Sequence, residues 1–99
     1  MELNKVKDPN NMTDFEKKHT PIIEISGDKV IVKVGDEIVH PMEPDHYIQY
    51  IELFKDNESI AKKELKPGDK PEAEFENVPL GNFKAQELCN LHGLWESIE

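Results

Sequence analysis

The sequence is poor in cysteine, in long apolar segments and in positive charge. Cys89 is the single cysteine among 99 residues, so no disulfide can form within the chain, and a lone thiol suits a reducing compartment. No apolar stretch approaches the length that crosses a bilayer, and the polar residues 1–11 lack the apolar centre of a secretory signal. The formal net charge of -9 disfavours nucleic acid or an anionic membrane as a general partner. We therefore expect a cytoplasmic protein with no nucleic-acid partner and no membrane partner.

The chain is also short, which limits the core that it can bury. Its 99 residues fit one compact domain, and with 36% hydrophobic and 33% charged residues the core is expected to be modest. A domain of this size is only marginally stable from burial alone, so a metal ion or a partner subunit would add useful stability. We predict a polar N-terminal arm over residues 1–15 and one domain over residues 16–99.

Short segments with a two-residue period favour an all-β fold. The clearest is segment 46–54, in which the odd-numbered residues from Tyr47 to Leu53 would share one face of a strand and the even-numbered residues the other. Turn formers such as Gly35-Asp36 and Asp56-Asn57 separate the segments. Further strands are expected over residues 22–25, 30–34, 59–65, 72–76 and 83–88.

Helical periodicity is weak throughout, and segment 16–19 is expected to be loop or extended because Pro21 follows it closely. Several short strands with turns every 8 to 12 residues or so are typical of an antiparallel sandwich or barrel. The sequence therefore predicts an all-β domain.

All four histidines lie at strand ends or in adjoining loops, where a rigid sheet usually displays functional groups: His19, His40, His46 and His92. His92 follows Cys89 by three positions, a spacing that lets a thiolate and an imidazole reach one metal ion from a tight turn. Gly93 would let the backbone fold closely there. This part of the chain is a candidate metal site.

Each of these residues also has an ordinary interpretation. A single histidine near a strand end is more often solvated or hydrogen-bonded than bound to a metal, and a lone cysteine is more often a small buried hydrophobe. A bare Cys-x-x-His spacing occurs by chance, and composition does not show that the four histidines converge. The combination of motifs, and not any one residue, carries the argument.

Three blocks in order resemble the iron domain of the desulfoferrodoxin and neelaredoxin family of superoxide reductases. That family has the patterns Glu-Lys-His-x-Pro, His-Pro-x-x-x-x-His-x-Ile and Cys-Asn-x-His-Gly. The matching blocks here are Lys18-His19-Thr20-Pro21, His40-Pro41-Met42-Glu43-Pro44-Asp45-His46-Tyr47-Ile48 and Cys89-Asn90-Leu91-His92-Gly93. The resemblance runs from Glu16 to Trp95, and it uses every histidine and the only cysteine.

This resemblance implies an immunoglobulin-like antiparallel β-sandwich of about seven strands with one iron ion (Fe2+/Fe3+) per chain. It implies a superoxide reductase of the one-iron type, which reduces superoxide to hydrogen peroxide by one electron. The family's equatorial imidazoles and axial thiolate map onto these five residues: His19, His40, His46, His92 and Cys89. An open position opposite the thiolate would admit a small substrate, and the thiolate would donate electron density to the iron. Ferrous iron with one thiolate keeps a net charge of +1, which attracts an anion.

Two charged residues before His19 are candidate catalytic groups by the same resemblance. Lys18 matches the family lysine that attracts superoxide and supports protonation of the product. The family usually has glutamate directly before that lysine, and this glutamate can take the sixth iron position in the oxidised state. Here Lys17 stands in that place and Glu16 one residue earlier. Either Glu16 reaches the iron from a shifted register, or the glutamate ligand is lost.

The resemblance also implies partners, and other functions remain open. Rubredoxin or a similar small protein would supply electrons, and a homodimer is favoured over a tetramer. A non-enzymatic sandwich that stores iron or carries electrons is the main alternative. A cupredoxin-like copper carrier fits less well, because no methionine follows His92. A metal-free interaction module is a third alternative.

Overall fold

The described part of the chain consists of eight strands and one short helix. The structure, a computed structural model, describes residues 2–35 and 38–98. The helix is α1 (Asp14–His19). The strands are β1 (Leu3–Asn4), β2 (Pro21–Ser26), β3 (Lys29–Val34), β4 (Ile48–Lys55), β5 (Glu58–Glu64), β6 (Glu72–Phe75), β7 (Phe83–Cys89) and β8 (Gly93–Glu96).

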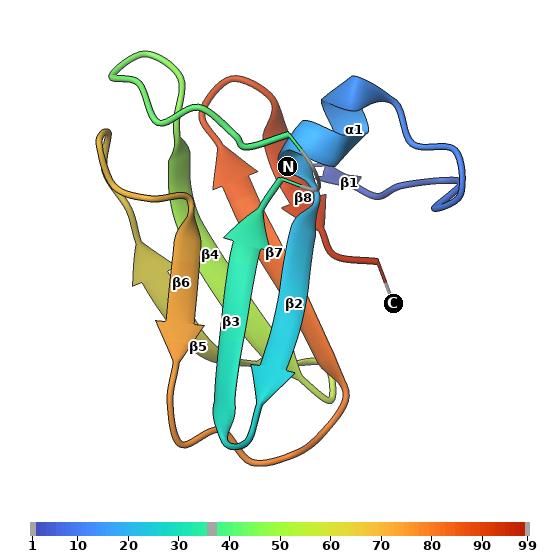
Figure 1. Ribbon diagram of the computed structural model, residues 1–99, viewed down its shortest axis with the longest axis vertical. Coiled ribbons are helices and arrows are strands. Elements are labelled where there is room, and N and C mark those ends of the chain that lie inside the picture. Colours follow the sequence, from blue (N-terminus) through green and yellow to red (C-terminus); the bar gives the residue numbers. More distant parts are fainter. Residues whose placement is uncertain (1, 36–37, 99) are drawn as a thin grey trace.

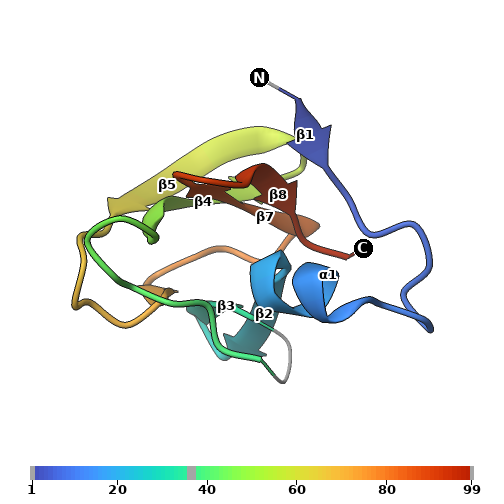
Figure 2. The same cartoon turned by 90° about the horizontal axis from the view of Figure 1, so that it is seen from above.

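The strands form two layers (Figure 1). A five-stranded sheet has the order β1-β8-β7-β4-β5, and a three-stranded sheet has the order β2-β3-β6. Seen from above, the two sheets lie one over the other, with α1 beside the three-stranded sheet (Figure 2). The strand pairs are antiparallel apart from β1, which runs parallel to β8. The predicted all-β sandwich is confirmed.

The core fills the space between the two layers. It is made mainly of aliphatic side chains from β3, β4, β6 and β7, namely Val30, Val32, Val34, Ile48, Ile51, Leu53, Ala73 and Ala85. Full burial of one valine, leucine or isoleucine side chain contributes about 1.5–3 kcal/mol to stability. Cys89, at the end of β7, belongs to the same buried cluster and is only 1% exposed. The single thiol therefore lies where the core meets one end of the sandwich.

The pairing of β4 with β7 contains an irregularity that changes the predicted pattern of faces. Strict alternation would place Ile48 and Ile51 on opposite faces of β4, yet both side chains are fully buried. The register between the two strands shifts between Ile48 and Tyr50, and a bulge of this kind re-aims the side chains beyond it. As a result, Ile48 joins the core and stands opposite Cys89 in the ladder.

The prediction for segment 16–19 was wrong, because it forms the end of α1. The helix begins with a capping box, in which the Thr13 side chain accepts a hydrogen bond from the Glu16 backbone and the Glu16 side chain accepts one from the Thr13 backbone. The helix ends at His19, and Thr20 is already extended, as expected for the residue before Pro21.

The two ends of the chain contribute strands that the sequence pattern did not predict. Leu3 and Asn4 pair with Leu94 and Trp95, so β1 extends the sheet from within the predicted polar arm. The Asn4 side-chain amide donates to the Leu94 carbonyl, and Lys5 lies 3.0 Å from the buried carboxylate of Glu96. The strands predicted between residues 22 and 88 are present, whereas the turn predicted at Gly35-Asp36 extends into residue 36, which lies outside the described residues.

Three connecting segments gather at one end of the sandwich, at the top of Figure 1: α1, the loop before β4 and the turn between β7 and β8. Within the described residues, no helix has the length and apolar character needed to cross a membrane.

Candidate metal centre

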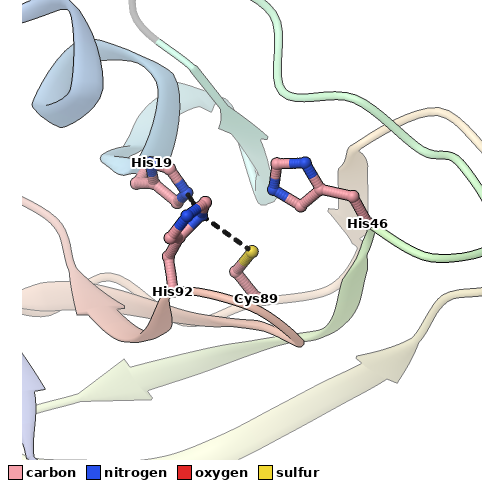
Figure 3. Close-up of side chains that lie close together, drawn as sticks. All are labelled: His19, His46, Cys89 and His92. Atoms are coloured by element: carbon pink, nitrogen blue, oxygen red, sulfur yellow. Dashed lines mark hydrogen bonds between the residues drawn. The ribbon is translucent and has the colours of Figure 1, made fainter.

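Imidazole and thiol side chains from these three segments converge in one cluster (Figure 3). Helix α1 supplies His19, and the loop before β4 supplies His46. The end of β7 supplies Cys89, and the turn that follows it supplies His92. One ligand atom of each residue lies within 4.8 Å of the others. Four of the five predicted ligands are thus brought to one point by segments that are far apart in sequence.

The fifth predicted ligand, His40, lies directly beside this cluster. Its ring centroid is 4.8 Å from that of His19 and 4.8 Å from that of His46. The side chain is 1% exposed, and its Nδ1 atom is 2.7 Å from the Pro41 carbonyl oxygen. His40 is therefore packed against the other histidines, although it is not among the four residues with the closest ligand atoms.

Backbone carbonyls select the tautomers of two of the rings. His19 Nδ1 is 2.8 Å from the Phe15 carbonyl, and His40 Nδ1 has the contact with Pro41 described above. A carbonyl can only accept, so each Nδ1 donates and the lone pair of a neutral ring resides on Nε2. In His92 the nitrogen that faces the cluster is instead Nδ1, which lies 3.1 Å from His19 Nε2 and 3.9 Å from Cys89 Sγ.

Unpaired buried nitrogens indicate that the cluster fits a metal ion. The Nε2 atoms of His40 and His46 are buried and have no hydrogen-bond partner within the described part of the chain. Leaving a buried donor or acceptor unpaired costs about 1–3 kcal/mol. Coordination by these nitrogens would remove that cost, and mixed imidazole and thiolate donors suit iron, zinc or copper.

The local environment keeps the imidazoles in the form that binds metals. Burial lowers the pKa of His19 and that of His40 to about 4 each. Burial also lowers the pKa of His46, with smaller contributions from His92 and Lys18. These three rings are therefore neutral at neutral pH, and only a neutral imidazole offers a lone pair to a metal ion.

Two opposing effects act on the pKa of the Cys89 thiol. Burial raises its pKa, while hydrogen bonds from the backbone N–H groups of Leu91 and His92 lower it. Gly93 has a φ of 86°, a conformation that glycine adopts without strain, and it pairs with Cys89 across the turn. The turn thus folds back closely enough for its own amides to reach the sulfur, and a bound cation would favour the thiolate further.

An aromatic wall supports two of the imidazoles. The Phe15 ring lies 4.5 Å from the His19 ring and 4.9 Å from the His92 ring, centroid to centroid. Trp95 stacks on His19 at 5.1 Å, and its indole N–H donates to the His92 carbonyl. Phe15 is a residue that the motifs did not indicate, although its position four residues before His19 places the two rings together on a helix.

A buried carboxyl group was also missed. Glu87 is completely buried on β7, and neither of its side-chain oxygens has a hydrogen-bond partner among the described residues. Burial raises its pKa to about 9, so the group is neutral at neutral pH. The two-residue period of the strand offered a signal, because it places Glu87 on the same face as Ala85 and Cys89.

The two charged candidates on α1 have different surroundings. The charge of Lys18 contributes to lowering the pKa of all three histidines His19, His40 and His46, so its ammonium group acts on the cluster. The Glu16 carboxylate instead accepts a hydrogen bond from the Thr13 backbone N–H at 2.9 Å. Glu16 therefore caps the start of α1 and is not part of the cluster in this conformation.

Comparison with known proteins gives one consistent answer. A family model described as Desulfoferrodoxin matches residues 11–98. A desulfoferrodoxin homologue from Archaeoglobus fulgidus is 50% identical over 82 residues, which cover 83% of this chain and 63% of that protein. The chain thus spans less than two thirds of the length of this relative.

Shorter relatives match over most of their length. A protein described as a putative superoxide reductase from Methanocaldococcus jannaschii is 40% identical, with 85% of this chain and 82% of that protein covered. The solved structure of a superoxide reductase (1Fe-SOR) from Giardia intestinalis has a TM-score of 0.74 at 33% identity, covering 82% of this chain and 95% of that one.

The capping box makes a direct prediction about Glu16. Replacing Glu16 with alanine removes the acceptor for the Thr13 backbone N–H, so the free energy of unfolding should fall by about 0.5–1 kcal/mol. Glu16→Gln is the matched control, because an amide oxygen serves the capping box nearly as well. Urea unfolding of the metal-free protein, followed by circular dichroism, measures both variants. Equal losses of stability in the two would contradict this role for Glu16.

Proposed function

The chain belongs to the desulfoferrodoxin family, and on that premise we propose that it is a superoxide reductase. In this reaction superoxide takes up one electron and two protons and becomes hydrogen peroxide. The observation that carries the proposal is the convergence of His19, His46, Cys89 and His92, whose ligand atoms lie within 4.8 Å of one another. Nothing in a β-sandwich requires three imidazoles and a thiol at one end of its core.

The proposed metal is a single iron ion held by five side chains, namely His19, His40, His46, His92 and Cys89. The neutral imidazoles and the unpaired Nε2 atoms of His40 and His46 support this set. When bound, iron supplies the one-electron chemistry by alternating between Fe2+ and Fe3+. The thiolate of Cys89 would contribute the only negative charge of the set and would donate electron density to the iron, which would favour transfer of an electron from Fe2+ to the substrate.

Lys18 has the proposed task of attracting the anionic substrate. A protein with a net charge of -9 repels superoxide at long range. Physiological salt screens exposed charges beyond about 8 Å, so the charges beside the site dominate at short range. The half-buried Lys18 supplies positive charge there, and its ammonium group can also give up a proton toward the product.

The aromatic side chains limit access from one side. Trp95 stacks on the His19 ring, and Phe15 lies against His19 and His92, so the approach of water and anions from that side of the imidazoles is restricted. The imidazole of His92 is nevertheless exposed at the surface. This exposure supports electron entry from a docked protein, for which we propose rubredoxin or a similar small carrier.

We further propose that the protein works in the cytoplasm as a homodimer. The free thiol of Cys89 suits a reducing compartment. Sedimentation equilibrium of the purified protein measures the oligomer, and a monomer at micromolar concentration would contradict the dimer.

Replacing Cys89 with serine tests the ligand set. The oxidised, iron-loaded protein should show a broad absorption band at the red end of the visible spectrum, because a thiolate transfers charge to ferric iron. Cys89→Ser should abolish this band, while far-ultraviolet circular dichroism reports that the sandwich still folds. Iron analysis separates the centre from a blue-copper site. A band that persists in a folded variant would exclude Cys89 as a ligand.

Replacing Lys18 tests the attraction of substrate. Lys18→Ala should lower the second-order rate constant for superoxide by about tenfold at low salt, and it should flatten the dependence on ionic strength. Lys18→Arg should keep the attraction but, because guanidinium does not release its proton, should slow any step that needs one. Lys66→Ala, an exposed lysine in the loop after β5, is the control. Pulse radiolysis gives these rates, and an unchanged rate for Lys18→Ala would remove Lys18 from the proposal.

Glu16 remains a proposed ligand of the oxidised metal, and it would have to leave the capping box to coordinate. Glu16→Gln separates the two roles, because glutamine keeps the cap but carries no charge. We expect the visible spectrum of the oxidised Glu16→Gln variant to differ from that of the oxidised wild type, and the difference to depend on pH. Identical spectra across pH in wild type and Glu16→Gln would show that Glu16 does not coordinate.

A further inference from the structure

Hydrogen bonds of one residue, Asn90, join the loop that carries His46 to the end of β7 and the turn after it, where Cys89 and His92 lie. The Tyr47 backbone N–H donates to Asn90 Oδ1 at 2.8 Å, and Asn90 Nδ2 donates to the Asp45 carbonyl at 3.0 Å. The Asn90 backbone N–H donates to the Tyr47 carbonyl at 3.2 Å. Within the described residues, these are the hydrogen bonds that join residues 43–47 to residues 89–93.

The three hydrogen bonds bracket His46. They end on the residue before it and on the residue after it, so they fix the backbone on both sides of its Cα atom. Asn90 itself directly follows Cys89 and stands two residues before His92. The side chain and the backbone N–H of this one residue therefore tie the backbone around His46 to Cys89 and His92.

The rings of the histidines are held in different ways. His19 and His40 are each fixed by a hydrogen bond from Nδ1 to a nearby carbonyl of their own segment. His46 has no such anchor, because neither nitrogen of its ring has a hydrogen-bond partner in the part of the chain that the structure describes. Its placement depends on the position of its backbone. That backbone is held within the loop by two hydrogen bonds with the Glu43 backbone, and Asn90 joins it to the turn after β7.

We propose that Asn90 is a positioning residue for the metal centre, which holds His46 at the correct distance from Cys89 and His92. The inference rests on the proposed metal centre and gives a role to a residue that does not touch the metal. Partners of this kind orient the ligands, and their loss typically lowers metal affinity by about 10- to 100-fold.

The effect on the metal should exceed the effect on folding. Asn90 is exposed, so water can replace its hydrogen bonds when the side chain is removed, and the fold loses little. The bulge between Ile48 and Tyr50 also leaves this part of β4 less regular than the rest. In Asn90→Ala, the Cys89–Ile48 pair and the hydrogen bond from the residue 90 backbone to the Tyr47 carbonyl remain. The two side-chain hydrogen bonds on either side of His46 are lost, so His46 can shift relative to Cys89 and His92.

The experiment measures Co2+ binding to metal-free protein through the absorption of the cobalt–thiolate bond. Asn90→Ala should weaken Co2+ binding by about tenfold or more and should shift or weaken that absorption band. Asn90→Asp keeps the acceptor for Tyr47 but loses the donor to Asp45, and it should fall between wild type and Asn90→Ala. Asn82→Ala is the matched control, since Asn82 is an exposed asparagine at the opposite end of β7.

The outcomes separate the inference from the proposed function. Asn90→Ala with the affinity and spectrum of wild type would overturn the positioning role while leaving the metal centre intact. An equal loss in Asn82→Ala would also overturn it, because the effect would then be general destabilisation. Co2+ binding that depends on Asn90 in a protein without superoxide activity would support the inference and contradict the proposed reaction. A wild-type protein that binds no Co2+ would overturn both.

Discussion

The pairing of β4 with β7 is the constraint on which the site depends. Both strands lie in the middle of the five-stranded sheet, and the aliphatic side chains of the core hold them in register. Cys89 ends β7 directly opposite Ile48, so the thiol is fixed by the same packing that stabilises the fold. The other donors are then added around a sulfur atom whose position is already determined. A donor set built in this way costs little additional conformational entropy, because most of its backbone is ordered by the core.

The α1 segment completes the site from the other sheet. The helix is only six residues long, which is too short to be stable alone, so its capping box and the contacts of Phe15 with His92 and Trp95 are needed to hold it in place. Because of this arrangement, the two sides of the histidine–cysteine cluster differ in how easily a substrate can approach. Aromatic rings close one side, while the charge of Lys18 acts from the same helix on the neutral imidazoles.

Much of the fold and of the site could be predicted from the sequence, but for different reasons. Strands between residues 22 and 88 follow from local alternation, and the five candidate ligand positions follow from the three motif blocks. The structure brings four of these five positions together. The strands β1 and β8 could not be predicted this way, because two- and four-residue strands form only through partners elsewhere in the sheet. Thr13 and Glu16 have the spacing of a capping box, which signals the start of α1, whereas the family resemblance indicated Glu16 only as a candidate iron ligand. The proposed role of Asn90 depends on the three-dimensional structure, since no sequence pattern reveals which carbonyl an exposed amide will meet.

The unpaired nitrogens of His40 and His46 have a consequence for the abundance of the protein. Groups that lack partners in the metal-free state make that state less stable than the same chain with an ion bound. By mass action, an ion at one hundred times its dissociation constant adds about 2.7 kcal/mol to the stability of a fold that binds it. For a small domain this is a large share of the total. The folded fraction, and with it the resistance to proteolysis, then follows the supply of the metal, so that a cell short of the ion would degrade the empty chain first.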